Sequence, residues 1–365
     1  MRRPRQFRET RAPNCLRMGL MSSIAAVATA LPPHRITQAR AEEEFRRVHA
    51  QRPEVLRLLP VFTRSGVTSR HLAFPPEYYA RERSFEERNR DYVEQALQLA
   101  ERAGRACLEK ARVRPSEVDH FFLITTTGLA TPSLDALLMR PLGLRPDVRR
   151  SPLFGLGCAG GAGGVTRACD VLDGSSGSRA LVIAVELCGQ VFSPRANAPT
   201  DVIGSALFGD GAAAVLVAKG AGPRVVARRT VLYEGTEHLM GWAFTSEGMR
   251  LVLSKEVTDF IGERLRPVVE AFLKDCRLSP SQIAHWVLHP GGRRILETYQ
   301  EAFGLTDRDL RWSRGSLERI GNLSSASILF ILGDLLESGT PRPGDRGLMC
   351  ALGPGFASEL LLLEW

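Results

Sequence analysis

Residues 153–172 read LFGLGCAGGAGGVTRACDVL, an apolar run that passes through a glycine-rich segment into a helical pattern. Cys158 lies at the junction, where the positive end of a helix dipole would stabilise its thiolate. The glycines beside it let a substrate or another backbone segment approach closely. A small buried cysteine in a glycine-rich turn fits the same features, so both interpretations stay open here. A dinucleotide-binding loop is favoured less, because the distal acidic residue of that motif does not fit.

Strand-like and helix-like patterns alternate on both sides of this stretch. This alternation predicts an α/β fold with covered sheets. The break GAGP at residues 220–223 separates two halves. The expected strands are 24–31, 119–127, 151–157, 180–187, 211–218 and 224–232. A strand and turn are also expected in WVLHPGG, and two strands around the turn of the C-terminal GLMCALGPGFASELLLLEW. The expected helices lie within 35–115 and over 158–172, 254–276, 293–304 and 324–338.

Composition excludes several classes of protein. The 365 residues are 44% hydrophobic and 24% charged, which excludes general disorder. The sequence contains no run of eighteen apolar residues, so we expect no membrane-spanning helix. Seven cysteines without a CxxC pair argue against a disulfide scaffold or a zinc finger and fit a reducing, cytoplasmic location. All but four of the 48 basic residues are arginine. This bias indicates either scattered surface charge or a patch for phosphate groups, which arginine binds bidentately.

The N-terminus allows two interpretations. Its basic head, the apolar stretch GLMSSIAAVATAL and the small residues that follow imitate a secretory signal. We favour a first strand from Ile24, preceded by a flexible basic extension over residues 1–20. Met18 or Met21 is then a possible start of translation.

Two further segments carry residues that could assist a thiolate. His289 ends the strand in WVLHPGG, where parallel sheets present functional side chains. His285 precedes it by four residues, but two histidines without a carboxylate or cysteine make a poor metal site, and we expect no metal. Asn322 in GNLSSAS is either a helix cap or an amide donor for a substrate oxygen.

Together the segments GLGCAGG, HPGGRRILE, GNLSSAS and GPGF resemble those of type III polyketide synthases, the chalcone and stilbene synthase-like group of the thiolase superfamily. TALPPHRITQ, GLRPDVRR and SALFGDGAAA add to the resemblance, which covers residues 21–365. It implies a thiolase-like five-layered αβαβα fold with two pseudo-symmetric halves, at 21–223 and 224–365. It also implies a cytoplasmic homodimer.

The resemblance assigns roles residue by residue. Cys158 matches the acyl-accepting nucleophile, His289 and Asn322 match its two partners, and Phe208 matches a gatekeeper. Further positions are expected around the substrate cavity, namely Thr126, Thr127, Cys188, Val191, Trp242, Leu251, Ser324 and the loop of Gly353, Pro354, Gly355 and Phe356. Arg57, Arg64, Arg70 and Arg294 are candidates for the phosphates of CoA, and Thr131 matches the position that reaches across the dimer.

Three residues depart from the plant enzymes. Leu251 replaces a second gatekeeper phenylalanine, Trp242 replaces a small glycine, and Val191 replaces a threonine. An aliphatic gate and a bulky wall do not suit a coumaroyl starter. We therefore expect a fatty acyl-CoA starter, malonyl-CoA as extender, and an alkylpyrone or alkylresorcinol product.

The expected mechanism pairs a Cys158 thiolate with a His289 imidazolium and uses no cofactor beyond the CoA thioester substrates. Malonyl-CoA is decarboxylated in the same pocket, and the enolate attacks the acyl group on Cys158. One alternative is an initiating β-ketoacyl-ACP synthase that condenses once. Another is a basic protein that binds nucleic acid or membranes without catalysis, but the arginines are spread through the chain and aromatic residues are few.

Overall fold

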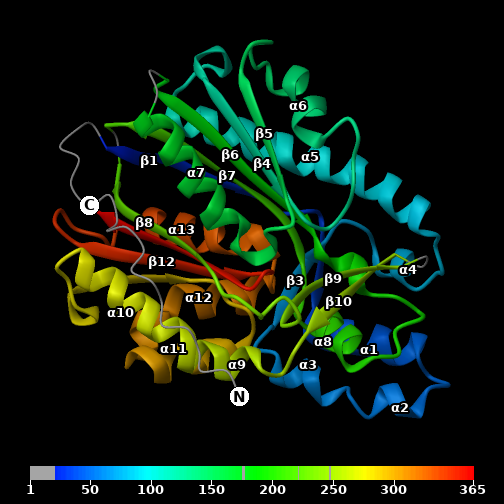
Figure 1. Ribbon diagram of the computed structural model, residues 1–365. Coiled ribbons are helices and arrows are strands. Elements are labelled where there is room, and N and C mark those ends of the chain that lie inside the picture. Colours follow the sequence, from blue (N-terminus) through cyan, green and yellow to red (C-terminus); the bar gives the residue numbers. More distant parts are fainter. Residues whose placement is uncertain (1–20, 175–176, 221, 246–247) are drawn as a thin grey trace.

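The computed structural model describes residues 21–174, 177–220, 222–245 and 248–365 (Figure 1). The predicted N-terminal extension at 1–20 lies outside these residues. The strands are β1 (Ser22–Ala30), β2 (His34–Thr37), β3 (Ser69–Leu72), β4 (His120–Thr125), β5 (Arg149–Phe154), β6 (Arg179–Leu187), β7 (Asp210–Lys219), β8 (Arg224–Leu232), β9 (Met240–Thr245), β10 (Gly248–Leu253), β11 (His285–Leu288), β12 (Arg346–Gly353) and β13 (Ala357–Glu364).

The helices alternate with these strands. They are α1 (Gln38–Val48), α2 (Pro53–Leu56), α3 (Pro60–Arg64), α4 (Pro76–Tyr79), α5 (Phe85–Ala111), α6 (Leu134–Leu142), α7 (Gly160–Gly174), α8 (Pro199–Leu207), α9 (Val257–Phe260), α10 (Arg266–Asp275), α11 (Arg293–Phe303), α12 (Asp307–Ile320) and α13 (Ser327–Glu337). Short 3-10 turns include η2 (Gly157–Ala159), η3 (Cys188–Val191) and η6 (Ser324–Ala326). No helix among the described residues is long and apolar enough to cross a membrane.

The main sheet consists of two sections with the same internal pattern. Its strand order is β11-β12-β13-β8-β1-β7-β6-β4-β5. β1 and β8 share only the residue pair Ser23 and Arg224, so the sheet divides there. In the first section β1, β7 and β6 are antiparallel and β4 runs parallel to β6. β8, β13 and β12 are likewise antiparallel, and β11 runs parallel to β12. The second half of the chain therefore repeats the topology of the first.

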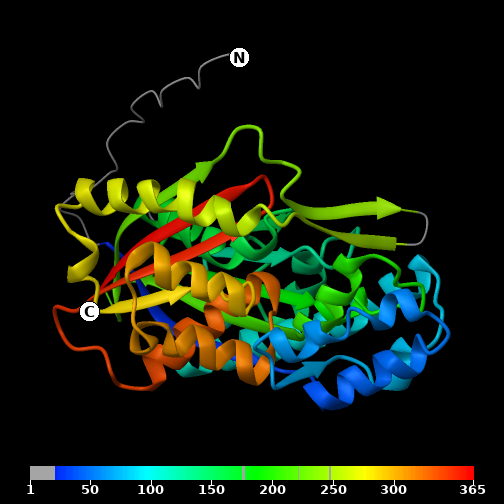
Figure 2. The same cartoon turned by 90° about the horizontal axis from the view of Figure 1, so that it is seen from below.

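Helices cover both faces of each section, which produces five layers. The hairpin β9–β10 projects from this body (Figure 2). α5 and α6 cover the outer face of the first section, and α10 and α11 pack with the outer face of the second. α7 and α13 fill the middle layer between the sections. This is the predicted thiolase-like α/β architecture.

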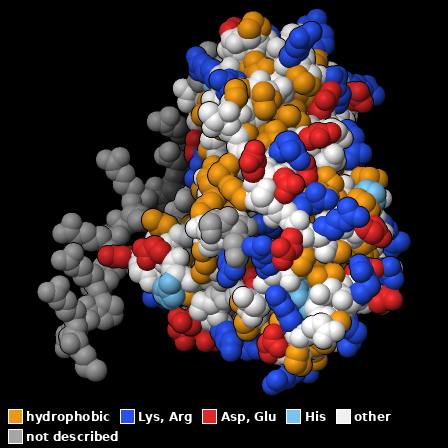
Figure 3. All heavy atoms as spheres, turned by 90° about the vertical axis from the view of Figure 1, so that its right-hand side faces the viewer, with side chains coloured by type: hydrophobic (Ala, Val, Ile, Leu, Met, Phe, Trp, Pro, Cys, Tyr) orange, Lys and Arg blue, Asp and Glu red, His pale blue; other side chains and the backbone are white. Residues whose placement is uncertain are grey.

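Basic and acidic side chains are interspersed on the described surface and do not form large patches of one charge. The face in Figure 3 carries basic and acidic side chains beside one another, with apolar patches between them. Many arginines pair with a nearby carboxylate, as Arg46 does with Glu42 and Arg266 with Glu270. The arginine bias of the sequence is therefore largely scattered surface charge.

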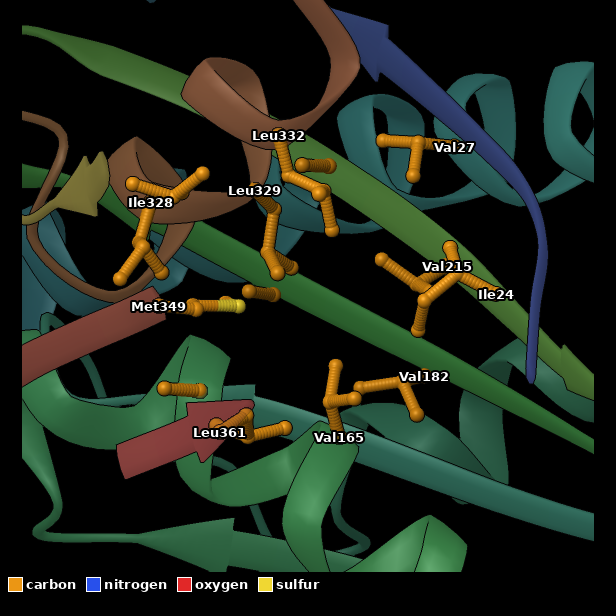
Figure 4. Close-up of a cluster of buried hydrophobic side chains, with 14 of the residues drawn as sticks. Ile24, Val27, Val165, Val182, Val215, Ile328, Leu329, Leu332, Met349 and Leu361 are labelled. Carbon is orange, nitrogen blue, oxygen red and sulfur yellow. The ribbon is translucent and has the colours of Figure 1, made fainter. Parts of the chain in front are cut away.

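The middle layer holds the main core. Val215 on β7 and Met349 on β12 come from different sections and point toward the same cluster (Figure 4). Successive residues of a strand face opposite sides of its sheet, so the neighbours Ala214 and Leu216 contact the outer helices. Strands buried on both faces explain the nearly continuous apolar runs in the sequence.

Several local predictions differ from the structure. The predicted helix 254–276 consists of α9, a π-helical segment at Ile261–Leu265 and α10. Pro267 in the first turn of α10 cannot donate a helical hydrogen bond, which accounts for a break there. The sequence patterns also did not predict β2, β3, α12 or the β9–β10 hairpin. β2, β3 and the hairpin strands are short, and α12 has few apolar residues among many charged ones, although Leu310, Leu317 and Ile320 lie at helical spacing.

Candidate active site

Cys158 lies in η2, directly between the end of β5 and the start of α7. Gly157 before it has φ +49° and faces the ring of Pro354, where a side chain would collide at 2.4 Å. Gly161 after it packs so closely that a Cβ would meet the carbonyl oxygen of Ser325 at 2.2 Å. The glycines of this segment therefore allow α7 and the GPGF loop to pack closely around Cys158. They do not form a dinucleotide-binding loop.

The three residues singled out by the motifs line one cavity of about 500 Å³. Cys158 comes from η2, His289 follows the carboxyl end of β11, and Asn322 follows α12. Each follows a strand or helix whose position the layered core fixes. Three segments more than 30 residues apart in the chain thus line the same cavity.

The amide of Asn322 is held in one orientation. Its Oδ1 accepts hydrogen bonds from the backbone N–H of Ser324 at 2.8 Å and from the Ser327 hydroxyl at 3.5 Å. The two Nδ2 hydrogens are the remaining donors of this side chain, which lines the cavity. Asn322 is not the N-cap of α13, which begins after Ala326. Oδ1 thus caps the turn that leads into α13, while the Nδ2 hydrogens are available as donors, so both sequence interpretations fit this geometry.

The backbone of Asn322 also positions Phe208. The Asn322 N–H donates to the carbonyl of Leu207 at 2.9 Å, and the Gly209 N–H donates to the carbonyl of Asn322 at 3.1 Å. This bridge places the Phe208 ring on the cavity beside Trp242, with ring centroids 6.4 Å apart.

Burial leaves both Cys158 and His289 neutral in the substrate-free site. It raises the pKa of the Cys158 thiol to about 12 and lowers the pKa of the His289 imidazole to about 3. The Cys158 Sγ contacts the Ser324 hydroxyl at 3.7 Å. Both pKa shifts oppose the predicted resting thiolate–imidazolium pair, which the helix dipole at the start of α7 would favour.

The cavity wall matches the predicted residues in part. Phe208, Trp242, Leu251, Ser324, Pro354 and Phe356 line it together with Arg294, and apolar side chains such as Ile203, Leu207, Met240, Leu253 and Ile295 complete it. Trp242 and Leu251 face each other as paired residues of the β9–β10 hairpin. Gly353 ends β12 and packs against the carbonyl of Leu156, while Gly355 forms the turn.

Gly353 and Gly355 do not line the cavity themselves, and four other predicted cavity residues lie elsewhere. Thr127, Cys188 and Val191 surround a separate void of about 30 Å³ that also touches Trp242. The Trp242 indole therefore contacts both spaces and separates this void from the main cavity. Thr126 is bound to a buried carboxylate instead, with its hydroxyl donating to Glu186 at 2.9 Å.

Sequence reasoning missed Glu186, which anchors the wall behind the cavity. The carboxylate is fully buried at the end of β6 and accepts from the hydroxyls of Thr126, Thr127 and Ser325 and from the Thr126 N–H. Burial raises its pKa, and these donors oppose that shift. A single acidic residue in the apolar strand ALVIAVEL was the available signal, since buried charges require partners.

The predicted CoA-binding arginines fall into two groups. Arg57 and Arg64 are exposed near the ends of α2 and α3, and Arg294 is exposed on α11 at the cavity. The Arg293 N–H donates to the carbonyl of Ser65 at 3.1 Å, so Arg64 and Arg294 each lie one residue from this contact.

Arg70 is a correction to the sequence prediction. It is only 2% exposed, and its guanidinium donates to the backbone carbonyls of Ser205, Ala206 and Phe208. It also contacts Gln38. A phosphate at the surface cannot contact a guanidinium enclosed in this way, so Arg70 fixes the end of α8 and does not bind CoA.

His285 does not form a metal pair with His289. Its Nε2 contacts Asp345 at 2.9 Å, and its ring packs against Trp365. No group of three or more metal-binding side chains occurs in the described ranges. Thr131 is exposed beside the cis peptide bond to Pro132.

The fold and this site define a condensing enzyme of the thiolase-like class that acts on CoA thioesters. Residues 11–223 match the family model of the chalcone and stilbene synthase N-terminal domain, and residues 224–364 match that of the C-terminal domain. The chain therefore belongs to the chalcone and stilbene synthase family. It is a type III polyketide synthase, an acyltransferase, which excludes the binding-only alternative and favours iterative CoA-dependent condensation over the carrier-protein enzyme.

Relatives align along nearly the whole chain. The 1,3,6,8-tetrahydroxynaphthalene synthase of Streptomyces peucetius is 40% identical over 94% of this chain and 93% of its own. A putative chalcone synthase of Bacillus subtilis is 36% identical over 94% and 99%. The crystal structure of 1,3,6,8-tetrahydroxynaphthalene synthase from Streptomyces coelicolor superimposes with a TM-score of 0.90, at 29% identity over 94% of this chain and 99% of that one.

Proposed function

We propose that the enzyme loads an acyl group from acyl-CoA onto Cys158 and extends it with malonyl-CoA. The observation that carries this proposal is the meeting of Cys158, His289 and Asn322 on one largely apolar cavity. A thiol nucleophile, an imidazole for proton transfer and an amide donor are the groups that thioester condensation requires.

Loading begins with the neutral pair. His289 accepts the thiol proton as Sγ of Cys158 attacks the thioester carbonyl, which forms a C–S bond and an oxyanion. The Asn322 Nδ2 and the protonated His289 donate hydrogen bonds to this oxygen. The bond to CoA sulfur then breaks, His289 returns the proton to CoA, and the acyl group stays on Cys158.

Extension uses the same donors. Malonyl-CoA loses CO₂ by cleavage of its C–C bond, and the electron pair becomes an enolate whose oxygen is stabilised by Asn322 and by the neutral N–H of His289. The enolate carbon attacks the acyl carbonyl on Cys158, which forms a C–C bond and releases the Cys158 thiolate. Transfer of the longer chain back to Cys158 repeats the cycle, and ring closure releases the product.

We place the CoA phosphates near the basic mouth of the cavity. Arg64 and Arg294 flank the contact between α3 and α11, and Arg57 lies on the neighbouring α2. Exposed guanidiniums bind phosphates bidentately without losing stabilising partners in the fold. We expect Arg64→Gln and Arg294→Gln to raise KM for acyl-CoA with little change in kcat.

We further propose that the starter substrate is a fatty acyl-CoA. Aliphatic side chains such as Leu207, Leu251, Leu253 and Ile295 dominate the lining, which suits an alkyl chain and an alkylpyrone or alkylresorcinol product. Each buried methylene contributes about 0.8 kcal/mol, equivalent to about a fourfold gain in kcat/KM. In a series from butanoyl- to dodecanoyl-CoA with malonyl-CoA, kcat/KM should therefore rise with each added methylene. The rise should stop at the chain length that fills the cavity. A flat series, or extension of aromatic starters only, would contradict the proposal.

A second candidate starter is malonyl-CoA itself. Two of the relatives described above are tetrahydroxynaphthalene synthases, and the bulky Trp242 occupies part of the cavity wall. Incubation with malonyl-CoA alone, followed by mass spectrometry, distinguishes the candidates. An aromatic product at the rate of the best alkyl-primed reaction would favour this second candidate.

We further propose a cytoplasmic homodimer. Leu129, Leu137, Phe154 and Phe244 are large exposed apolar side chains, and β5, which carries Phe154, is an edge strand. Apolar side chains at an edge favour association with a partner surface, and the predicted cross-dimer residue Thr131 follows Leu129 closely. Phe154→Arg should yield monomers in light scattering, whereas Leu232→Arg, at an exposed position on β8, should leave the dimer intact.

A further inference from the structure

A second cavity, of about 430 Å³, lies apart from the one that holds Cys158. Its walls are the end of α4, the start of α5 and the connection between them, the segment 190–196 that begins within η3, Asp201 on α8, and the start of β10. None of its described lining residues also lines the cavity of Cys158. A volume in this range suits a small organic ligand.

The walls of this second cavity are rich in arginine. Five arginines line it, against two acidic residues, Glu82 and Asp201. Glu82 pairs with Arg195 at 2.8 Å. Asp201 accepts hydrogen bonds at 3.0 Å from the backbone N–H groups of Asn197 and Ala198 at the start of α8. Both carboxylates are therefore already engaged by other groups of the protein.

Arg81 and Arg83 are two arginines of this wall that lack an acidic ion-pair partner within the described residues. No ion pair joins either of them to a carboxylate within residues 21–174, 177–220, 222–245 and 248–365. The guanidinium of Arg83 lies 4.1 Å from the centre of the Tyr78 ring, which holds it in place. Its Nε is buried without a hydrogen-bond partner. A buried donor of this kind is costly to leave unpaired, so a ligand acceptor is expected.

The rest of the wall is apolar. Phe85, Phe192, Val191 and Met249 contribute aromatic and aliphatic surface opposite the arginines. A hydrated inorganic ion would leave this surface uncovered. A ligand with an anionic end and an aromatic or alkyl body would satisfy both parts.

We propose that this cavity is a second binding site, for a small carboxylate or phosphate that carries an aromatic or alkyl group. Arg81 and Arg83 bind the anionic end through charge-assisted hydrogen bonds. Phe85 and Phe192 contact the body of the ligand. No described residue lines both this cavity and the cavity of Cys158, and the small void beside Trp242 lies between them, sharing Val191 and Met249 with the second cavity.

Calorimetric titration of the full-length Cys158→Ala variant tests the site without turnover. The probes are benzoate and phenyl phosphate, with benzyl alcohol and inorganic phosphate as controls for the charge and for the apolar body. We expect one of the two aromatic anions to bind at a single site, at least tenfold more tightly than either control. The preferred anion then distinguishes a carboxylate from a phosphate ligand. Adding Arg81→Gln and Arg83→Gln should weaken binding at least tenfold, and Arg308→Gln, an exposed arginine on α12, should not.

Several results would overturn the proposal. These are no binding of either aromatic anion, equal binding of benzyl alcohol, or unchanged affinity after loss of Arg81 and Arg83. Competition by saturating coenzyme A would place the anion in the cavity of Cys158 instead, and would equally refute the second site. If the double variant does not fold, Arg81→Gln alone provides the test, because Arg81 is exposed and its removal leaves no buried group unpaired.

Discussion

Replacing Asn322 by aspartate isolates the donor function of its side chain. The Oδ1 atom accepts from the Ser324 N–H and the Ser327 hydroxyl, and an aspartate oxygen can accept both bonds. The main-chain hydrogen bonds to Leu207 and Gly209 do not involve the side chain. Asn322→Asp therefore preserves the local structure while it removes the Nδ2 hydrogens.

The expected magnitude follows from this one lost donor. Removing a donor to a developing oxyanion costs about 2.7–4 kcal/mol, or about 10²–10³-fold in rate. The new carboxylate adds repulsion toward the enolate, so the loss should reach at least this range. We expect malonyl-CoA decarboxylation to fall by about 10²–10³-fold. Acylation of Cys158 by a starter should survive more fully, because the protonated His289 still donates to the loading oxyanion, whereas only the neutral imidazole donates during decarboxylation.

Two measurements separate these steps. Release of CO₂ from malonyl-CoA reports decarboxylation, and intact-protein mass spectrometry reports the acyl group on Cys158. Asn322→Ala should show the same split. Ser327→Ala, which removes the 3.5 Å contact to Oδ1 and the 2.7 Å hydrogen bond from the Leu323 N–H but keeps the Nδ2 donors, should lose much less activity. Decarboxylation at the wild-type rate in Asn322→Asp would refute the assignment of the amide as an oxyanion donor.

Three further predictions follow from single positions. Trp242→Ala should join the two voids that the indole separates, so a chain-length series should peak at a longer acyl-CoA; an unchanged optimum would show that the indole is not the barrier. Gly161→Ala should cost about 1–3 kcal/mol in urea unfolding, because its Cβ would meet the Ser325 carbonyl, whereas Gly315→Ala in open space on α12 should be neutral or stabilising. Burial lowers the pKa of His49 to about 4. As the pH falls, His49 therefore becomes protonated in the unfolded chain at a higher pH than in the folded protein. The free energy of unfolding should accordingly decrease as the pH falls from about 6.5 toward 4. His49→Phe should reduce this fall in thermal melts between pH 7.5 and 5, and an equal fall in the variant would contradict the cause.

The sequence supported the fold through patterns that are local. Apolar runs at β4, β6 and β7 predicted buried strands, because strands covered on both faces need apolar side chains throughout. The repeated β/α order, together with the resemblance carried by four motifs, led to the thiolase-like architecture. The helix α12 is mostly charged and its apolar residues are few, and the strands of the β9–β10 hairpin are short, so they were not predicted from the sequence.

The sequence also identified Cys158, His289 and Asn322 individually, since each stands in a distinctive glycine-rich segment. What it could not determine was how side chains from distant segments share space. Only the folded chain brings the three to one cavity, encloses Arg70 among backbone carbonyls, and inserts Trp242 between that cavity and Cys188.

The charge states likewise depend on tertiary structure. A helix N-terminus beside Cys158 predicts a thiolate from the sequence, but complete burial favours the neutral thiol and the neutral imidazole of His289. Desolvation is a property of everything packed around a group, and most of those atoms belong to residues far away in the chain. The sequence by itself thus determined which residues are available for chemistry, and the tertiary structure decided their surroundings and their resting protonation.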